Sequence, residues 1–273
     1  MLRNPKVAFG LSYLLLLSLI ALLAPYVSPY PPNEINPEEA LAAPSFKHLF
    51  GTDGLGRDIF SRVLYGARYS LPLGLVAVAI ATSAGCLFGV LAGYCGGIID
   101  GLIMRCVDIA LAFPTILLGL LVISVTGPGL TGIVLAVGVA SAPSFIRVVR
   151  GSVLVIRQMV YVEAARAIGV GFWRLLVRHV LPQTVGPVVT MATLGLAQAI
   201  FATSSLSFLG LGARPPTPEW GVMVSAARHQ LSASWWASTF PGIAITVTVL
   251  AINLLGDGLR DALDPRLRGK VIS

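Results

Sequence analysis

The sequence predicts an all-α, polytopic membrane protein with about six transmembrane helices. Of its 273 residues, 56% are hydrophobic and only 11% are charged, whereas soluble domains carry about 25% charged residues. So few charges cannot cover a water-facing surface, which favours an integral membrane protein. The basic residues gather at the ends of long apolar runs, where such residues orient a chain in the membrane.

The formal net charge of +7 would also suit a nucleic-acid-binding protein. The basic residues flank apolar runs and form no continuous stripe, so we expect contact with membrane lipid and no nucleic acid. The three cysteines and three histidines show no CxxC or HExxH spacing. We therefore expect no metal site, no bound cofactor and no catalytic residue in this chain.

The first predicted span runs from Val7 to about Tyr26, after Arg3 and Lys6. A cleaved signal peptide is the alternative, because it would share this basic start. The apolar core is longer than that of a typical signal peptide, and the sequence ALLA at 21–24 is no Ala-x-Ala cleavage site. We expect a retained span whose basic start faces the cytoplasm.

An irregular outer loop should follow, because residues 25–44 are rich in Pro, Asn and Glu. Residues 48–70 come next, with the sequence HLFGTDGLGRDIFSRVLYGARYS. The GTDGLGRD part is no phosphate loop, since it lacks Gly-Lys-Ser/Thr and GxGxxG. We interpret it as a polar turn that satisfies its own charges and fixes the chain's return to the membrane. Its candidate residues are Gly51, Thr52, Asp53, Gly56, Arg57 and Asp58.

The second span should run from about Leu71 to Tyr94. Within it, Gly85, Gly89 and Gly93 recur at four-residue spacing. Small residues at this spacing form a ridge that another helix can approach closely.

The third predicted span, 102–126, carries Arg105 and Asp108 near its inner end, three residues apart, so that they could pair on one helix face. The fourth span, 130–146, returns the chain to the inner side. We expect Pro143 to interrupt it, because proline removes a helical hydrogen bond.

The stretch from Tyr161 to Pro182 is YVEAARAIGVGFWRLLVRHVLP, too charged to span a membrane and too apolar for an ordinary linker. With Arg147, Arg150 and Arg157 just before it, it is the most basic part of the chain. Basic residues at span ends stay in the cytoplasm, so we predict a short helix pair on the inner membrane face.

In a helix, Ala164, Ala165 and Ile168 would present a small apolar patch to a soluble partner, with Glu163 beside it. Gly169 would then permit a sharp turn. A stripe facing the membrane interface would follow, formed by Phe172, Trp173, Leu176 and Val180. Pro182 would then end one helix and let the next begin. An amphipathic loop without a partner is the alternative, and the pattern alone leaves the two open.

A fifth span at about 185–209, an outer loop at 210–236 and a sixth span at about 240–255 complete the bundle. The outer loop contains RPPTP, which cannot be helical, and tryptophans that suit the membrane–water boundary. Its candidate residues are Arg214, Pro216 and Trp220. This topology places 13 of the 19 basic residues inside, so we expect both termini in the cytoplasm.

Two other classes of protein fit the pattern less well. An intramembrane hydrolase would need a base near Ser204, Ser205 and Ser207, and no His or Asp lies at that depth. A secondary transporter would show paired broken helices and an internal repeat, and neither is evident.

The segment EAARAIG (163–169), followed by Leu181-Pro182, resembles the EAA-loop signature of bacterial ABC importer permeases. The segments FGTDGLGRDIFSRVLYGARYSL (50–71), SFLGLGARPPTPEWG (207–221) and NLLGDGLRDALDPRL (253–267) narrow the resemblance to the dipeptide/oligopeptide/nickel family, in the branch of the second permease subunit. The resemblance covers nearly the whole chain. His179 is one departure, where the broad signature often has an aliphatic residue.

The resemblance implies a type I ABC importer permease fold in the bacterial cytoplasmic membrane. Residues 1–70 would form the first span and outer loop, and 71–273 the permease domain with its coupling loop, 157–182. The partners would be a homologous permease subunit, two ATPase subunits and an extracytoplasmic substrate-binding protein. ATP and Mg would be used by the ATPases, since this chain has no GxxxxGK[ST].

By resemblance, the chain would import di- or oligopeptides by alternating access, with nickel or a metal chelate as the alternative cargo. The coupling residues would be Glu163, Ala164, Ala165, Ile168, Gly169, Leu181 and Pro182, and the outer candidates would contact the binding protein or serve the structure.

Overall fold

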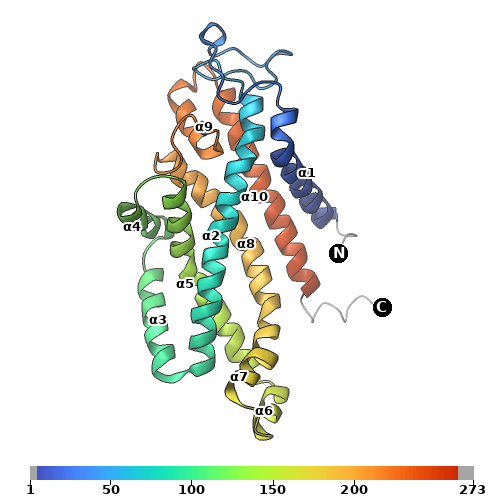
Figure 1. The fold of residues 1–273 in the computed structure, drawn as a ribbon, viewed down its shortest axis with the longest axis vertical. Coiled ribbons are helices and arrows are strands. Elements are labelled where there is room, and N and C mark those ends of the chain that lie inside the picture. Colours follow the sequence, from blue (N-terminus) through green and yellow to red (C-terminus); the bar gives the residue numbers. More distant parts are fainter. Residues whose placement is uncertain (1–4, 264–273) are drawn as a thin grey trace.

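Long helices that run side by side dominate the computed structural model of the chain, which describes residues 5–263 (Figure 1). In this part of the chain, regular structure is helical apart from one isolated bridge between Thr52 and Asp58. The long helices are α1 (Pro5–Val27), α2 (Ile59–Cys95), α5 (Leu130–Ile156), α8 (Leu181–Phe208) and α10 (Trp236–Leu263). The shorter ones are η1 (Pro37–Glu39), α3 (Gly97–Leu111), α4 (Thr115–Thr126), α6 (Val160–Ala167), α7 (Phe172–Leu175), η2 (Leu176–Val180), α9 (Trp220–Ala227) and η3 (Arg228–Gln230).

The described helices agree with the predicted all-α membrane bundle. Five stretches are long and apolar enough to cross a membrane, and α3 with α4 makes a sixth if that bent pair forms one span. Along the long axis, α6 and α7 lie at one end, whereas the 28–58 loop and α9 lie at the other (Figure 1). The two groups of candidate residues are therefore separated by the length of the bundle.

The α2–α5 contact confirms the predicted glycine ridge. A Cβ atom at Gly85 would lie 2.7 Å from Phe145 Cβ, and one at Gly89 would lie 2.8 Å from the carbonyl oxygen of Ile146. At Gly93 it would lie 2.8 Å from Val153 Cβ. These distances are too short for any side chain, so the glycines allow the two backbones to approach closely.

The third predicted span is not one helix. α3 ends at Leu111, and α4 begins at Thr115 with its axis turned by 99°. The cause is Pro114, which adopts an extended conformation and caps α4. A proline disfavours helical geometry at the residue before it, so the chain leaves the helix at Phe113.

The break predicted at Pro143 is wrong, and the chain stays helical through Pro182, although α8 does begin beside it as predicted. Pro143 lies within the continuous helix α5, buried with Phe145 in its contact with the rest of the bundle. Pro182 lies at the second position of α8, directly after the π-helical turn η2, where the Leu181 N–H donates to Leu176 O. Such a wider turn re-satisfies backbone groups near a proline, so the helix continues.

The predicted boundary at residue 70 stays a prediction, although α2 runs across that position without a break. The basic residues Arg3, Arg266, Arg268 and Lys270, on which part of the topology prediction depends, lie outside the described residues.

Candidate functional site

Of the predicted coupling residues, those from Glu163 to Gly169 lie on α6 and the turn that follows it, and Leu181 and Pro182 lie at the start of α8. α6 ends in a Schellman motif, in which the Gly169 N–H donates to Arg166 O at 3.0 Å and the Val170 N–H to Ala165 O at 3.1 Å. Gly169 has φ +83, a conformation that side-chain-bearing residues rarely adopt. The predicted sharp turn at this glycine is confirmed.

One face of α6 packs into the bundle and the other is open. Val162 and Ala165 are buried in an apolar cluster with residues of α5, α7 and η2. Glu163, Ala164 and Ile168 are exposed, and Ile168 is 82% exposed. The predicted patch therefore needs one correction: Ala165 faces the core, so the open surface is made by Ala164, Ile168 and their neighbours.

The predicted membrane-facing stripe is also wrong, because its members point in different directions. Phe172 and Trp173 are exposed, whereas Leu176 and Val180 are buried. The two buried members begin and end the π-helical turn Leu176–Val180, which packs into the apolar cluster with α5 and α6. Leu181 is partly buried on the same cluster as Leu176, and Pro182 is exposed.

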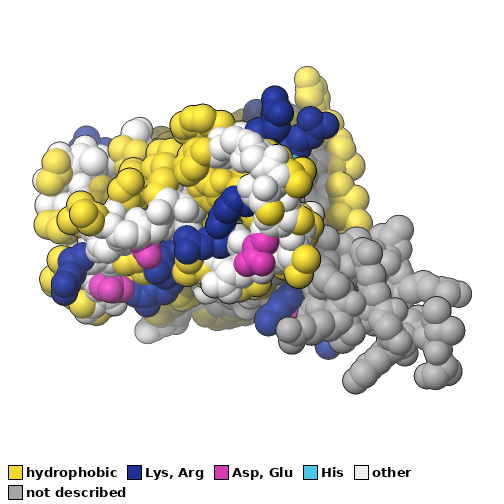
Figure 2. All heavy atoms as spheres, turned by 90° about the horizontal axis from the view of Figure 1, so that it is seen from below, with side chains coloured by type: hydrophobic (Ala, Val, Ile, Leu, Met, Phe, Trp, Pro, Cys, Tyr) yellow, Lys and Arg dark blue, Asp and Glu magenta, His cyan; other side chains and the backbone are white. Residues whose placement is uncertain are grey.

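Hydrogen bonds fasten this end to the long helices. Arg157 Nη1 donates to Gly93 O at 2.9 Å, and the Tyr94 hydroxyl donates to Phe172 O at 3.2 Å. Seen end-on, the surface combines apolar and basic side chains with scattered acidic ones (Figure 2). It offers a soluble partner both apolar contact and positive charge.

Ion pairs join α3 to α5 near this end, and they differ from the expected Arg105–Asp108 pair. Asp108 pairs with Arg147, and Arg150 Nη2 donates to Asp100 Oδ2 at 2.6 Å. The partners come from different helices because α3 and α5 pack together, which spacing along one helix does not reveal.

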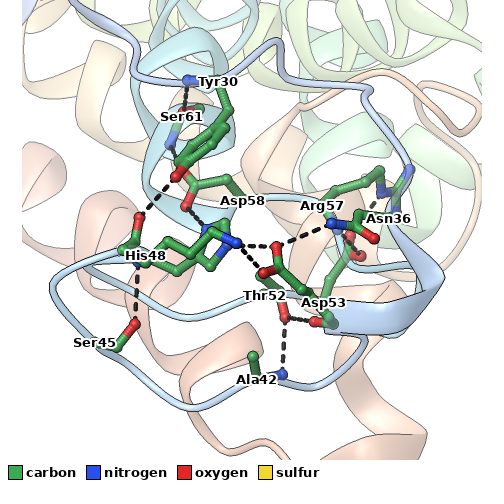
Figure 3. A network of polar contacts seen from close by, with 12 residues as sticks. Tyr30, Asn36, Ala42, Ser45, His48, Thr52, Asp53, Arg57, Asp58 and Ser61 are labelled. Atoms are coloured by element: carbon green, nitrogen blue, oxygen red, sulfur yellow. Dashed lines mark hydrogen bonds and ion pairs between the residues drawn. The ribbon is translucent and has the colours of Figure 1, made fainter.

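At the other end, the 51–58 turn is held by its own polar groups, as predicted (Figure 3). Asp53 Oδ2 accepts from Arg57 Nε at 2.7 Å, and Asp53 Oδ1 accepts from the Leu55 and Arg57 backbone N–H groups. Gly51 and Gly56 have positive φ, and a Cβ atom at Gly56 would lie 1.7 Å from Asn36 O. Only glycine fits there.

His48 and Glu39 also belong to this network, and the sequence did not identify them. Asp58 caps α2 by accepting from the Ser61 N–H at 2.7 Å, and its other oxygen lies 2.9 Å from His48 Nδ1. His48 Nε2 lies 3.0 Å from Glu39 Oε2. Hydrogen bonds from Lys47 and then His48 hold the pKa of Glu39 below its usual value. The sequence positions of His48 and Glu39 did not indicate these contacts, because the contacts form only when the loop folds back on itself.

The second outer segment is anchored by Glu219, another residue that sequence reasoning missed. It caps α9 by accepting from the Gly221 and Val222 N–H groups at 3.0 and 2.9 Å, and Ser70 Oγ donates to it at 3.3 Å. The carboxyl is fully buried, and this burial raises its pKa. An acidic residue before a helix start was the available signal.

Of the outer candidates, Trp220 is fully buried and donates from Nε1 to Val63 O at 3.0 Å. Its ring therefore packs in the core and does not face lipid. Thr52 is buried too, and its carbonyl accepts from Trp236 Nε1 at 3.1 Å. Arg214 and Pro216 are exposed.

Residues 85–269 match the family model described as the binding-protein-dependent transport system inner membrane component. The chain belongs to this family. Residues 1–44 match a second model, the N-terminal transmembrane domain of oligopeptide transport permease C. The predicted family is thereby confirmed, including its branch. As a family member, the chain is a permease subunit of a bacterial ABC importer, a multi-pass membrane protein that works with ATPase subunits and is not itself an enzyme.

This permease has relatives that align over nearly its whole length. The glutathione transport system permease protein GsiD of Pectobacterium atrosepticum is 46% identical over 267 residues, covering 97% of this chain and 88% of the relative. The di/tripeptide transport system permease protein DppC of Pseudomonas aeruginosa is 44% identical over 272 residues, covering 97% and 90%.

Solved structures of distant proteins share the permease fold. The inward-facing MetNI methionine ABC transporter aligns with a TM-score of 0.61 at 19% identity, covering 74% of this chain and 96% of that chain. An amino acid ABC transporter with histidines aligns with a TM-score of 0.59 at 15% identity, covering 74% and 94%. At such low identity the likeness concerns the fold alone.

Proposed function

We propose that this permease forms the translocation path of a peptide importer together with a homologous second permease subunit. The proposed substrate is inferred from the names of two relatives that are at least 44% identical to this chain. One is named for glutathione, itself a tripeptide, and the other for di- and tripeptides. Two ATPase subunits would use ATP and Mg, and an extracytoplasmic protein would deliver the peptide.

The exposed face of α6 is proposed to contact the ATPases. Its open residues Glu163, Ala164 and Ile168 stand at the end of the bundle, and its inner residues Val162 and Ala165 are packed against α5 and η2. A mechanical load on α6 would therefore be transmitted to α5 and, through η2, to α8. Alternating access follows if the load shifts these helices between two packings.

The proposed placement is the bacterial cytoplasmic membrane, with α6 and both termini inside. The support is the distribution of positive charge, since the α5–α8 end is rich in arginine. The 28–58 loop and α9 lie at the opposite end and would face the binding protein.

The substrate is tested by transport. The permease would be co-purified with its second subunit and ATPases, reconstituted into liposomes, and supplied with the binding protein, ATP and either a labelled dipeptide or nickel. ATP-dependent dipeptide accumulation is expected. Accumulation of nickel without dipeptide would make the metal, and not the peptide, the cargo.

The coupling role is tested in the same liposomes with Glu163→Trp and Gly169→Val combined. A bulky side chain blocks close approach, and valine is strained at φ +83. Peptide uptake should fall about tenfold or more relative to ATP hydrolysis, the effect of losing about 1.4 kcal/mol of coupling. Leu16→Trp, on the exposed surface of α1, is the control. Undiminished uptake by the double variant would remove α6 from the mechanism.

A further inference from the structure

A pocket of about 270 Å³ opens at the end of the molecule that carries the outer network, far from α6. It lies between the 53–57 turn, the start of α2, and α9. Val222, Met223 and Ala227 of α9 give it an apolar wall. Asp53, Arg57 and Arg62 also line it, so apolar and charged surfaces face the same space.

Two arginines of this pocket share one carboxylate. Arg57 Nε donates to Asp53 Oδ2 at 2.7 Å, and Arg62 Nε lies 3.9 Å from the same oxygen. The arginine side chains are only 9% and 4% exposed. The charged wall thus holds one positive charge in excess, weakly screened by water, and an entering anion would be stabilised there.

The two guanidinium groups differ in the use of their donors. Arg62 Nη1 donates to Pro32 O at 2.7 Å and to Asn33 Oδ1 at 3.1 Å, which fixes it to the loop. Within residues 5–263, the Arg57 side chain donates only from Nε, and its two terminal nitrogens have no hydrogen-bond partner. A guanidinium with two free donors matches the two oxygens of a carboxylate.

The size of the pocket limits what it can hold. Its volume of about 270 Å³ is at the small end of typical small-molecule sites, which measure roughly 300–1,000 Å³. An aspartate or glutamate side chain fits better, because its methylene groups would contact the α9 wall while its carboxylate meets Arg57. The pocket lies at the end proposed to face the outside, so a side chain that projects from the surface of another protein could enter it.

We propose that this pocket receives an acidic side chain of the extracytoplasmic substrate-binding protein, with Arg57 as the residue that binds its carboxylate. The inference rests on the proposed function, which brings that protein to this end of the permease. It adds the contact that would orient the docked protein, which is an ion pair between Arg57 and an acidic side chain of the binding protein.

The test is the dissociation constant of the binding protein for the complete transporter in lipid nanodiscs. Arg57→Gln removes the guanidinium and its charge but keeps a polar side chain, and it should weaken binding about tenfold or more, because a buried charge pair is lost. Arg228→Gln removes an exposed cation near the same end that does not line the pocket. It should change binding less than about twofold, since exposed charges contribute little.

A second variant avoids the Asp53–Arg57 contact. Ala226→Trp would fill the pocket from α9, where Ala226 is exposed and lines it, and Ala226→Ser is its matched control. The tryptophan variant should weaken binding as Arg57→Gln does, and the serine variant should bind like the wild type. If Arg57→Gln lowers the melting temperature of the complex, the Ala226 pair decides the matter.

Free glutarate distinguishes the two sources of a carboxylate. Titrated against the nanodisc complex, it should compete weakly with the binding protein in the wild type and not in Arg57→Gln. Arg57-dependent glutarate binding with unchanged docking would make this a solute site and overturn the proposal. Wild-type docking by both Arg57→Gln and Ala226→Trp would overturn it too, while peptide uptake by the wild type would leave the proposed function standing. A wild-type complex that binds no such protein would overturn both.

Discussion

At the scale of single residues, one buried carboxyl orders the segment between α8 and α10. Glu219 meets two backbone N–H groups of α9 and the Ser70 hydroxyl of α2, so it joins elements that are distant in the sequence. Burial raises its pKa despite these hydrogen bonds, because removal from water penalises the charged form.

The raised pKa predicts a pH dependence of stability. The folded protein holds the Glu219 proton more tightly than the unfolded chain, whose carboxyl has the usual pKa of 4.5. The contribution of this group is therefore complete below pH 4.5 and declines as the pH rises toward the raised pKa. Melting temperatures of the detergent-solubilised permease, measured across this range, should show a decline that is absent in Glu219→Gln.

Glu219→Ala is the companion variant, because it loses the cap itself. It should be less stable than Glu219→Gln by about 1 kcal/mol at every pH, the usual contribution of a helix cap. Parallel pH profiles of the wild type and Glu219→Gln would contradict the raised pKa.

At the scale of elements, the contact between α2 and α5 depends on the absence of side chains. A Cβ atom at Gly89 would approach the Ile146 carbonyl oxygen and Val149 Cβ to 2.8 Å, and a backbone atom cannot move aside. Gly89→Leu should therefore destabilise the bundle by about 1–3 kcal/mol or more through overpacking. The measurement is the monodisperse fraction and melting temperature after purification in detergent.

Gly101→Leu is the matched control, because a Cβ atom at Gly101 of α3 meets nothing within 4 Å. It should purify like the wild type. If the two variants behave alike, close approach at the glycine ridge is not what holds α2 to α5.

The glycine ridge could be predicted from the sequence, because glycines four residues apart must lie on one face of a helix. The effects of the prolines could not be predicted in this way. Pro114 ends a helix, Pro143 lies inside one, and Pro182 follows a π-helical turn. The three residues have the same local chemistry. What differs is the packing around them, and packing is settled only once the helices have met.

The coupling segment shows the same division. The turn at Gly169 was predictable, since glycine is needed where φ is positive. The inward position of Ala165 was not, because it depends on how α6 lies against α5 and η2. Likewise, the Asp53–Arg57 pair is local, but His48 joins Asp58 only because the loop folds back.

At the scale of the whole molecule, the candidate residues form two groups at opposite ends of one bundle (Figure 1). One group is basic and continuous with two long helices, and the other is a self-bonded loop network with a charged pocket. This separation suits a protein that receives force on one side of a membrane and substrate on the other.

The separation predicts which residues are reachable from each side of the membrane. After Cys86, Cys95 and Cys106 are changed to serine, Ile168→Cys and Leu49→Cys each supply one exposed thiol, since these positions are 82% and 52% exposed. A membrane-impermeant maleimide should label Leu49→Cys in spheroplasts and Ile168→Cys only in inverted vesicles. The reason is the positive-inside rule, by which arginine-rich segments at the ends of spans stay in the cytoplasm. Labelling of Ile168→Cys in intact spheroplasts would reverse the topology, and α6 could then not meet a cytoplasmic ATPase.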